Sequence, residues 1–480
     1  MASYYEVQFR AGANWEKVSS HNDKTGARTA AQDLIKIDKH DAVRVLEKDG
    51  DDAKQVFFHE KTRTKLTLKI GEIAEAPLCT AASDLLGATA RRTILALLHD
   101  FLASRGITAF ELVHRAAHLM DLEAEKDLFA KATQRVAALQ ARAAKGDPKA
   151  RAAELAKYAT ELAKAADAAG DIKAATATIA AEGLAAARSA LEAAGKTAPN
   201  ALGTALAAHL ADAPDWETKL ARLAALLERD AAKETRALVD EIMAELIEAV
   251  ANLGFLLGMQ SDPGGAMVAL TELARGGYKI RPDQDKAATI AALNTVLGKF
   301  PLRLTQAALL APVVAALRGT KPITKIGGAE DYKAFFMIVA AARAPGGLCG
   351  GGPMAEAVIR RIRVVMGSPG RDLAVDEAVA TTLDNLTSRA EKIGFLLDLS
   401  ATETGAKCKA TATRLLNAQA NGMKTIRDLI PAGNSPQALA SAFEDVFRRL
   451  APDTVPADFK GIVLKALARV SAAAKQPATA

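Results

Sequence analysis

The chain has 480 residues, a length that accommodates about three domains with cores of their own. Half of the residues are hydrophobic but only 4% are aromatic, and alanine supplies much of the apolar share, which favours helix over sheet. Charged residues of both signs make up a quarter of the chain, which is typical of solvated helical surfaces and not of a disordered protein. The formal net charge of +6 permits contact with nucleic acid or an anionic surface without requiring it.

The cysteines and the apolar runs predict a soluble protein of the cytoplasm. Cys79, Cys349 and Cys408 are far apart and form neither a metal-binding nor a CxxC spacing, which fits inert thiols in a reducing compartment. The N-terminus lacks the basic and apolar regions of a signal peptide. The longest apolar run, from Ala307 to Leu317, is shorter than the roughly 20 residues that a membrane-spanning helix needs.

Residues 1–72 predict a small α/β module of order ββαββ. Apolar and polar residues alternate from Tyr5 to Phe9, the period of a half-buried strand. The Asn-Asp pair at 22–23 can cap a helix that ends near Ile37, and Asp49-Gly50 predicts the turn of a second hairpin.

This module contains a candidate partner surface of aromatic and basic side chains: Tyr4, Trp15, Phe57, Arg63 and Lys65. Rings beside cations can stack on the bases of single-stranded nucleic acid. The same aromatic residues can instead form the core that a small domain needs. A third alternative is a protein partner that docks on an edge strand.

Residues 73–122 predict a helix pair. A glycine after Arg105 can end the first helix, and Thr108 with Glu111 forms the capping box of the second. The stretch from Leu98 to Met120 resembles the first two helices of lambda-repressor-type helix-turn-helix domains, a resemblance that implies DNA binding. No third helix follows in the expected place, and ordinary helix capping explains the same pattern.

His114 and His118 are four residues apart, a spacing that metal sites use on a helix. A third ligand would have to come from Asp100, Asp121 or elsewhere, and no HExxH motif is present. We therefore interpret both histidines as structural and expect no metal and no cofactor.

Residues 123–200 are rich in alanine and predict three helices of similar length. Breaks at Gly146-Asp147-Pro148 and at Gly170-Asp171 separate them, and Gly195 closes the third. Thin leucine and isoleucine stripes predict a helical hairpin or coiled coil. These stripes can pack within the chain or, through residues 124–195, against a second copy in a homo-oligomer.

Residues 201–480 predict a multi-helix domain. A long amphipathic helix from Asp215 to Leu257 is expected to form its spine. The tetrapeptide Gly254–Leu257 recurs as Gly394–Leu397, which indicates either an internal duplication or two similar helix ends. The fold class is therefore mostly α, with the small α/β module first, the alanine-rich helices next and the multi-helix domain last.

A glycine-rich stretch from Gly346 to Pro353 precedes a helix and defines a candidate anion or ligand loop. Glycines ahead of a helix can present backbone N–H groups to a phosphate. The candidate residues are Gly350, Gly351, Gly352, Arg360, Arg361 and Arg363. We favour a flexible linker between two helical layers over this loop, since no Walker lysine follows and no strand precedes. Cys349 is not expected to be a nucleophile, because no histidine follows His209 in the chain.

No catalytic constellation stands out, so an enzyme is the less favoured class. We predict a cytoplasmic interaction or scaffold protein that binds protein partners and can self-associate. The alternative is a nucleic-acid-binding protein acting through residues 1–120.

Overall fold

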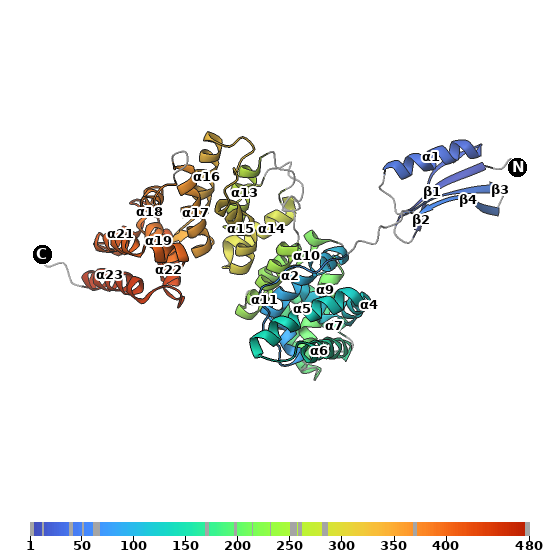
Figure 1. Ribbon diagram of the computed structural model, residues 1–480, viewed down its shortest axis with the longest axis horizontal. Coiled ribbons are helices and arrows are strands. Elements are labelled where there is room, and N and C mark those ends of the chain that lie inside the picture. Colours follow the sequence, from blue (N-terminus) through green and yellow to red (C-terminus); the bar gives the residue numbers. More distant parts are fainter. Residues whose placement is uncertain are drawn as a thin grey trace. The chain divides into compact units, whose positions relative to one another are not determined.

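The structure is a computed structural model, and it describes residues 4–11, 14–37, 42–49, 52–60, 68–168, 172–195, 199–213, 215–230, 232–249, 257, 262–280, 287–367 and 372–475. Internal contacts divide the chain into two compact units, Met1–Leu68 and Lys69–Ala480 (Figure 1). The expected boundary at residue 72 lies close to this division. The helices expected in residues 73–122, 123–200 and 201–480 all belong to the second unit.

The first unit has the predicted ββαββ order. Its elements are β1 (Tyr4–Ala11), β2 (Asn14–His21), α1 (Lys24–Ile37), β3 (Ala42–Asp49) and β4 (Asp52–Glu60). The strands form an antiparallel sheet of order β2-β1-β3-β4. Asp23 caps α1 as expected, because its Oδ1 accepts a hydrogen bond from Gly26 N at 2.8 Å.

Helix α1 covers one face of this sheet (Figure 1). Val7, Val43 and Val45 point to that face and pack against Ala27 and Ala31 of the helix. Since side chains alternate along a strand, the residues between these valines lie on the opposite face, which α1 does not cover.

Among the described residues of the second unit, the regular secondary structure is helical apart from one two-stranded hairpin, which confirms the mostly α fold class. Its earlier helices are η1 (Ala82–Leu86), α2 (Ala88–Arg105), α3 (Ala109–His114), α4 (Ala116–Ala124), α5 (Lys126–Ala144), α6 (Pro148–Ala168), α7 (Lys173–Glu182), α8 (Leu184–Ala193), α9 (Pro199–Ala211), α10 (Trp216–Arg229) and α11 (Lys233–Ala249).

The later elements continue the same unit, because α10 packs against α14 and α11 against α15. They are α13 (Pro263–Ala274), α14 (Ala287–Lys299), α15 (Arg303–Arg318), α16 (Ala329–Ala342), β5 (Arg343–Ala344), β6 (Gly347–Leu348), α17 (Gly351–Val365), α18 (Val375–Asp384), α19 (Arg389–Ser400), α20 (Glu403–Lys407), α21 (Lys409–Asn421), η2 (Ile426–Leu429), α22 (Pro436–Leu450) and α23 (Ala457–Lys475).

The alanine-rich region forms four helices, α5 to α8, where three were predicted. Asp147 caps α6 as expected, but Gly183 has a backbone φ of 102° and divides the third predicted helix into α7 and α8. Helices α5 and α6 pack against each other as a hairpin. The apolar stripes of these helices, including Leu162 and Ile179, are buried within the same chain. Self-association through 124–195 stays a prediction.

The predicted long helix from Asp215 to Leu257 is wrong, because the chain breaks between α10 and α11. Asp230 causes the break: its carboxylate accepts hydrogen bonds from Ala232 N at 3.1 Å, Thr235 Oγ1 at 2.8 Å and Ala185 N at 2.8 Å. An aspartate that binds the free N–H groups of neighbouring helix starts favours a new helix over continuation. Residues 254–256 lie outside the described residues, so the proposed repeat stays a prediction, whereas Gly394–Leu397 is buried in α19.

Two buried ion pairs join the early helices to α10 and α11. Lys219 Nζ lies 2.6 Å from Glu111 Oε1, with 3% and 0% of the two side chains exposed. Arg91 Nε lies 2.6 Å from Glu245 Oε1, and Glu245 also accepts a hydrogen bond from Phe110 N at 2.9 Å. The capping box of Thr108 and Glu111 is confirmed, so one glutamate both starts α3 and neutralises Lys219.

The two histidines of the candidate metal spacing lie around α3. His114 is buried against Phe110 and Gly203, and burial, with a further contribution from Arg91, lowers its pKa to about 3. Within the described residues, no group of three or more His, Cys, Asp or Glu side chains could hold a metal ion. All six residues of α3 are buried, so this helix presents no face to DNA.

No single helix in the described part of the chain has the length and apolar character needed to cross a membrane. By length and composition alone, α14 and α15 would suffice only as a pair, and they are bent by 115° at their break.

Replacement of one partner of a buried ion pair tests how much the early helices depend on it. Lys219→Met leaves the Glu111 carboxylate buried without a counter-charge, and we expect a loss of about 3–5 kcal/mol in the free energy of unfolding. Chemical denaturation measures this quantity. Lys131→Met, at an exposed position of α5, is the matched control and should change stability by less than about 0.5 kcal/mol. Equal effects of the two substitutions would contradict the assignment.

Candidate binding groove

The glycine-rich stretch forms a hydrogen-bonded hairpin, and the flexible linker that the sequence analysis favoured is not observed. Strands β5 and β6 pair, and Cys349 N donates a hydrogen bond to Ala342 O at 2.8 Å. Gly347, Gly350 and Gly351 have φ values of 147°, 83° and 56°, which other residues rarely adopt. The glycines are therefore needed for the turn that leads directly into α17.

Arg449 of α22 fastens this hairpin to α19. Its Nε donates to Asp398 Oδ2 at 2.8 Å, its Nη1 lies 2.6 Å from Asp445 Oδ1, and its Nη2 donates to Leu348 O at 2.9 Å. Asp445 also accepts a hydrogen bond from Gly346 N at 2.9 Å. Because two backbone groups of the hairpin, Gly346 N and Leu348 O, bind charged side chains of α22, the network holds the hairpin against α19 and α22.

A close approach between two glycines completes the attachment. A Cβ atom placed on Gly394 would lie 1.7 Å from Gly346 O, far inside van der Waals contact. The hairpin can therefore rest on α19 only because position 394 has no side chain.

The charges of this network are perturbed by burial. Burial raises the pKa of Asp398 to about 6, although Arg449 opposes the shift. Burial also acts to lower the pKa of Arg449, but attraction to Asp398 and Asp445 outweighs it and raises that pKa above its ordinary value. The Cys349 thiol is protonated at neutral pH, since burial raises its pKa to about 12. It is therefore not an activated nucleophile.

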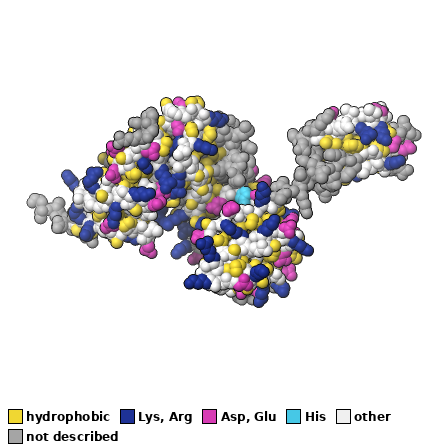
Figure 2. All heavy atoms as spheres, viewed as in Figure 1, with side chains coloured by type: hydrophobic (Ala, Val, Ile, Leu, Met, Phe, Trp, Pro, Cys, Tyr) yellow, Lys and Arg dark blue, Asp and Glu magenta, His cyan; other side chains and the backbone are white. Residues whose placement is uncertain are grey.

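A groove of about 1030 Å³ opens beside the hairpin. Gly350 and the first turn of α17, up to Pro353, form one wall, and further walls come from Arg275 at the end of α13 and from α14, α15, α19, α20 and α22. Figure 2 shows Lys and Arg side chains gathered over α15 and α17 on the face in view. The charged residues that line the groove are Arg275, Lys299, Arg303, Arg318, Arg448, Arg449, Glu356, Asp398, Glu403, Glu444 and Asp445.

Most of these charges are already paired. Asp398 and Asp445 bind Arg449, and Glu356 lies 2.9 Å from Arg318. Among the described residues, no carboxylate lies within ion-pair distance of Arg275, Lys299 or Arg303. The groove thus offers three cations, and its buried carboxylates are engaged.

The structure separates the six candidate loop residues. Gly350, Gly351 and Gly352 line the groove, whereas Arg360, Arg361 and Arg363 do not. Arg361 is buried and binds Asp331 together with the carbonyl groups of Gly319 and Lys321. Arg363 donates to Leu373 O at 2.8 Å, and Arg360 lies 3.5 Å from Glu356. The three arginines therefore hold neighbouring segments.

The candidate partner surface of the first unit is also divided. Tyr4 and Trp15 lie on the uncovered face of the sheet, with the Arg44 guanidinium 4.2 Å from the centre of the Trp15 ring. Phe57 lies on the other face, where it packs against the core beside α1. Arg63 and Lys65 lie outside the described residues.

The sequence analysis did not identify the cations of the groove. The three cations that the groove offers come from segments well before the glycine-rich stretch in the chain: Arg275, Lys299 and Arg303. No local sequence pattern around them indicates that they lie near that stretch in the fold. The one usable signal was the helix break at Phe300-Pro301, which places Lys299 and Arg303 at adjoining helix ends.

Comparison of the chain with known protein families, with curated proteins and with solved structures found no match. A fold alone does not define a function, so the functional argument rests on the side chains and their geometry.

The contact between Gly394 and Gly346 gives a direct test of the attachment. Gly394→Ala places a methyl group against Gly346 O, and we expect a loss of about 2 kcal/mol or more despite the better helix propensity of alanine. Chemical denaturation measures the loss, and hydrogen exchange of residues 343–350 should become faster. Gly461→Ala in α23 is the control, because nothing lies within 4 Å of its added Cβ, and it should be neutral or stabilising. Slow exchange in the Gly394 variant would contradict the attachment.

Proposed function

We propose that this chain is a non-enzymatic interaction protein, an adaptor that binds a protein partner in the groove beside Gly350–Pro353. The observation that carries the proposal is a groove of about 1030 Å³ that combines a fixed backbone wall with three cations lacking carboxylate partners in the described structure. Fixed backbone reduces the entropy that binding would otherwise cost.

The lining of the groove defines the chemistry of the partner. Arg275, Lys299 and Arg303 favour carboxylate groups, while the exposed lining residues Pro301, Pro345 and Pro452 supply apolar contacts. An acidic protein segment that also contains apolar residues fits this surface. Asp445 and Glu356 each already neutralise an arginine, which favours binding over acid–base catalysis at these two carboxylates.

In this proposal the adaptor works in the cytoplasm. Its support is that all three cysteines are buried free thiols, which is ordinary for a reducing compartment. Self-association through 124–195 is a weaker part of the proposal. The leucine and isoleucine stripes that would drive it, such as Leu155, Leu162 and Leu191, are already buried in the same chain.

A second candidate function, binding of single-stranded nucleic acid, is favoured by the uncovered sheet face. Tyr4 and Trp15 lie there together with Lys17, Arg44 and Lys48. Bases stack on aromatic rings, and neighbouring cations attract phosphates. Helix α3 contributes nothing to this candidate, because it is buried.

Charge reversal in the groove tests the adaptor proposal. Lys299→Glu with Arg303→Glu should weaken binding of the partner by about 10-fold or more, since two favourable charge contacts become repulsive. Partners are first captured from the protein's own cell extract with the wild-type chain and identified by mass spectrometry. A purified partner is then titrated against each variant.

The control for charge reversal carries the same change in net charge at exposed positions elsewhere. Lys131→Glu with Lys149→Glu, on α5 and α6, should bind the partner as the wild type does. Equal binding by the groove variant and the control would contradict the adaptor proposal.

Titration with short single-stranded DNA and RNA tests the second candidate. Binding should fall steeply as salt is raised, and Trp15→Ala should weaken it by about 10-fold. Lys54→Ala is the control. Lys54 lies opposite Glu47 in the register of β3 and β4, and both side chains belong to the other face of the sheet. Absence of binding at low salt would remove this candidate.

A further inference from the structure

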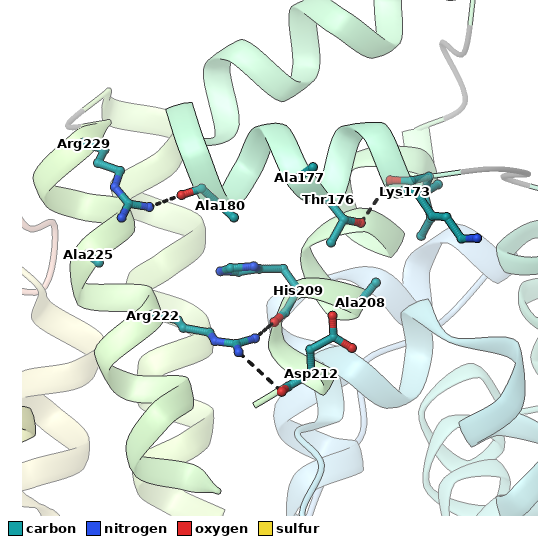
Figure 3. A pocket seen from close by; sticks show the side chains of 11 residues that line it. Lys173, Thr176, Ala177, Ala180, Ala208, His209, Asp212, Arg222, Ala225 and Arg229 are labelled. Carbon is teal, nitrogen blue, oxygen red and sulfur yellow. Dashed lines mark hydrogen bonds between the residues drawn. The ribbon is translucent and has the colours of Figure 1, made fainter. Parts of the chain in front are cut away.

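A second cavity, separate from the groove, lies between α7, α9 and α10 (Figure 3). Its volume is about 760 Å³, within the range of small-molecule sites. Alanines from all three helices form much of its wall and keep it open. The ionisable residues that line it are Lys173, His209, Asp212, Arg222 and Arg229.

The two arginines are held in place by backbone carbonyl groups. Arg222 donates to His209 O and, at 3.4 Å, to Asp212 O, at the end of α9. Arg229 donates to Ala180 O near the end of α7. These carbonyl groups share only the partial negative charge of a helix C-terminus, about half an elementary charge per helix. No described carboxylate lies within ion-pair distance of Arg222 or Arg229, so both guanidinium groups keep positive charge and free N–H groups.

His209 projects into the cavity between these two side chains (Figure 3). Burial lowers the pKa of its imidazole, and the positive charges of Arg222 and Arg229 lower it further, while Asp212 opposes them. The ring is therefore neutral at neutral pH and can gain a proton when negative charge arrives.

We propose that this cavity is a binding site for a small phosphate monoester, with Arg222 and Arg229 holding the oxyanion and the alanine-lined space holding the organic part. Guanidinium groups present paired N–H donors that match tetrahedral oxyanions. A phosphate group alone would fill only part of the cavity. The helices that form this site contribute no residue to the groove. A test of the anion site is therefore independent of a test of the adaptor function.

Anion binding is expected to be coupled to protonation of His209. A dianion between the arginines offsets their positive charge, which contributes to the low pKa of His209. The pKa of His209 therefore rises when the anion binds. The complex then takes up a proton that the free protein lacks, and affinity increases as pH falls. The other ionisable groups that face His209 are Lys173, Asp212, Arg222 and Arg229.

Calorimetric titration of the full chain with sulfate tests the site. Sulfate remains a dianion between about pH 5.5 and pH 8, so any pH dependence belongs to the protein. We expect one saturable site that is several-fold tighter at the lower pH. Arg229→Gln should weaken binding by about 10-fold, and Arg229→Lys should retain more of it. Arg188→Gln, at an exposed position of α8, is the control and should bind as the wild type does.

His209→Gln should keep sulfate binding and lose its pH dependence. Thermal unfolding of each variant verifies that it is folded. No saturable binding of sulfate below about 10 mM, or equal losses in Arg229→Gln and Arg188→Gln, would overturn the site. At pH 8 glycerol phosphate should bind at least as tightly as inorganic phosphate. Weaker binding would overturn the assignment to a monoester.

Discussion

The first half of the helical unit depends on charges that are paired away from water. Arg91 with Glu245 and Lys219 with Glu111 connect helices that are more than a hundred residues apart in the chain. Removing such charges from water costs several kcal/mol per ion, and the cost is offset only when hydrogen bonds satisfy the groups completely. Glu111 and Glu245 meet this condition, because each also binds a backbone N–H group at the start of α3. In the sequence, the alanine-rich helices α5 to α8 lie between the segments that these ion pairs connect, α2 and α3 on one side and α10 and α11 on the other.

Much of the local structure could be predicted from the sequence, because local chemistry determines it. Asp23, Thr108 and Asp147 cap the helices that they were expected to cap, and Gly106 ends α2 with a left-handed φ of 63°. The alternation of Val7 with its polar neighbours indicated the sheet face correctly. The prediction of one long helix was wrong at Asp230. A helix tolerates an aspartate in its middle unless the starts of other helices are close enough for the carboxylate to bind their N–H groups. That proximity is a tertiary fact, and no local pattern records it.

The candidate site could be predicted only in part, for a similar reason. The glycines at 350–352 indicated a special backbone, and the structure places that backbone beside a groove. The arginines at 360, 361 and 363 were selected because they follow in sequence, but a helix turns successive residues to different sides. One of them, Arg361, is buried against Asp331. The cations that line the groove come from α13, α14 and α15, and the cavity beside α9 had no sequence signal beyond an isolated histidine.

The contact between Gly346 and Gly394 has a consequence for the kinetics of recognition. A loop that must fold around its partner contributes an ordering step, which slows association and makes binding tolerant of different shapes. The hairpin beside the groove is already ordered by Arg449 and by the absence of a side chain at position 394. A partner bound as proposed would therefore meet a rigid wall. Differences between related partners would then be expressed in how long they stay bound, and a poorly fitting segment would be rejected by shape, with no loop movement to accommodate it.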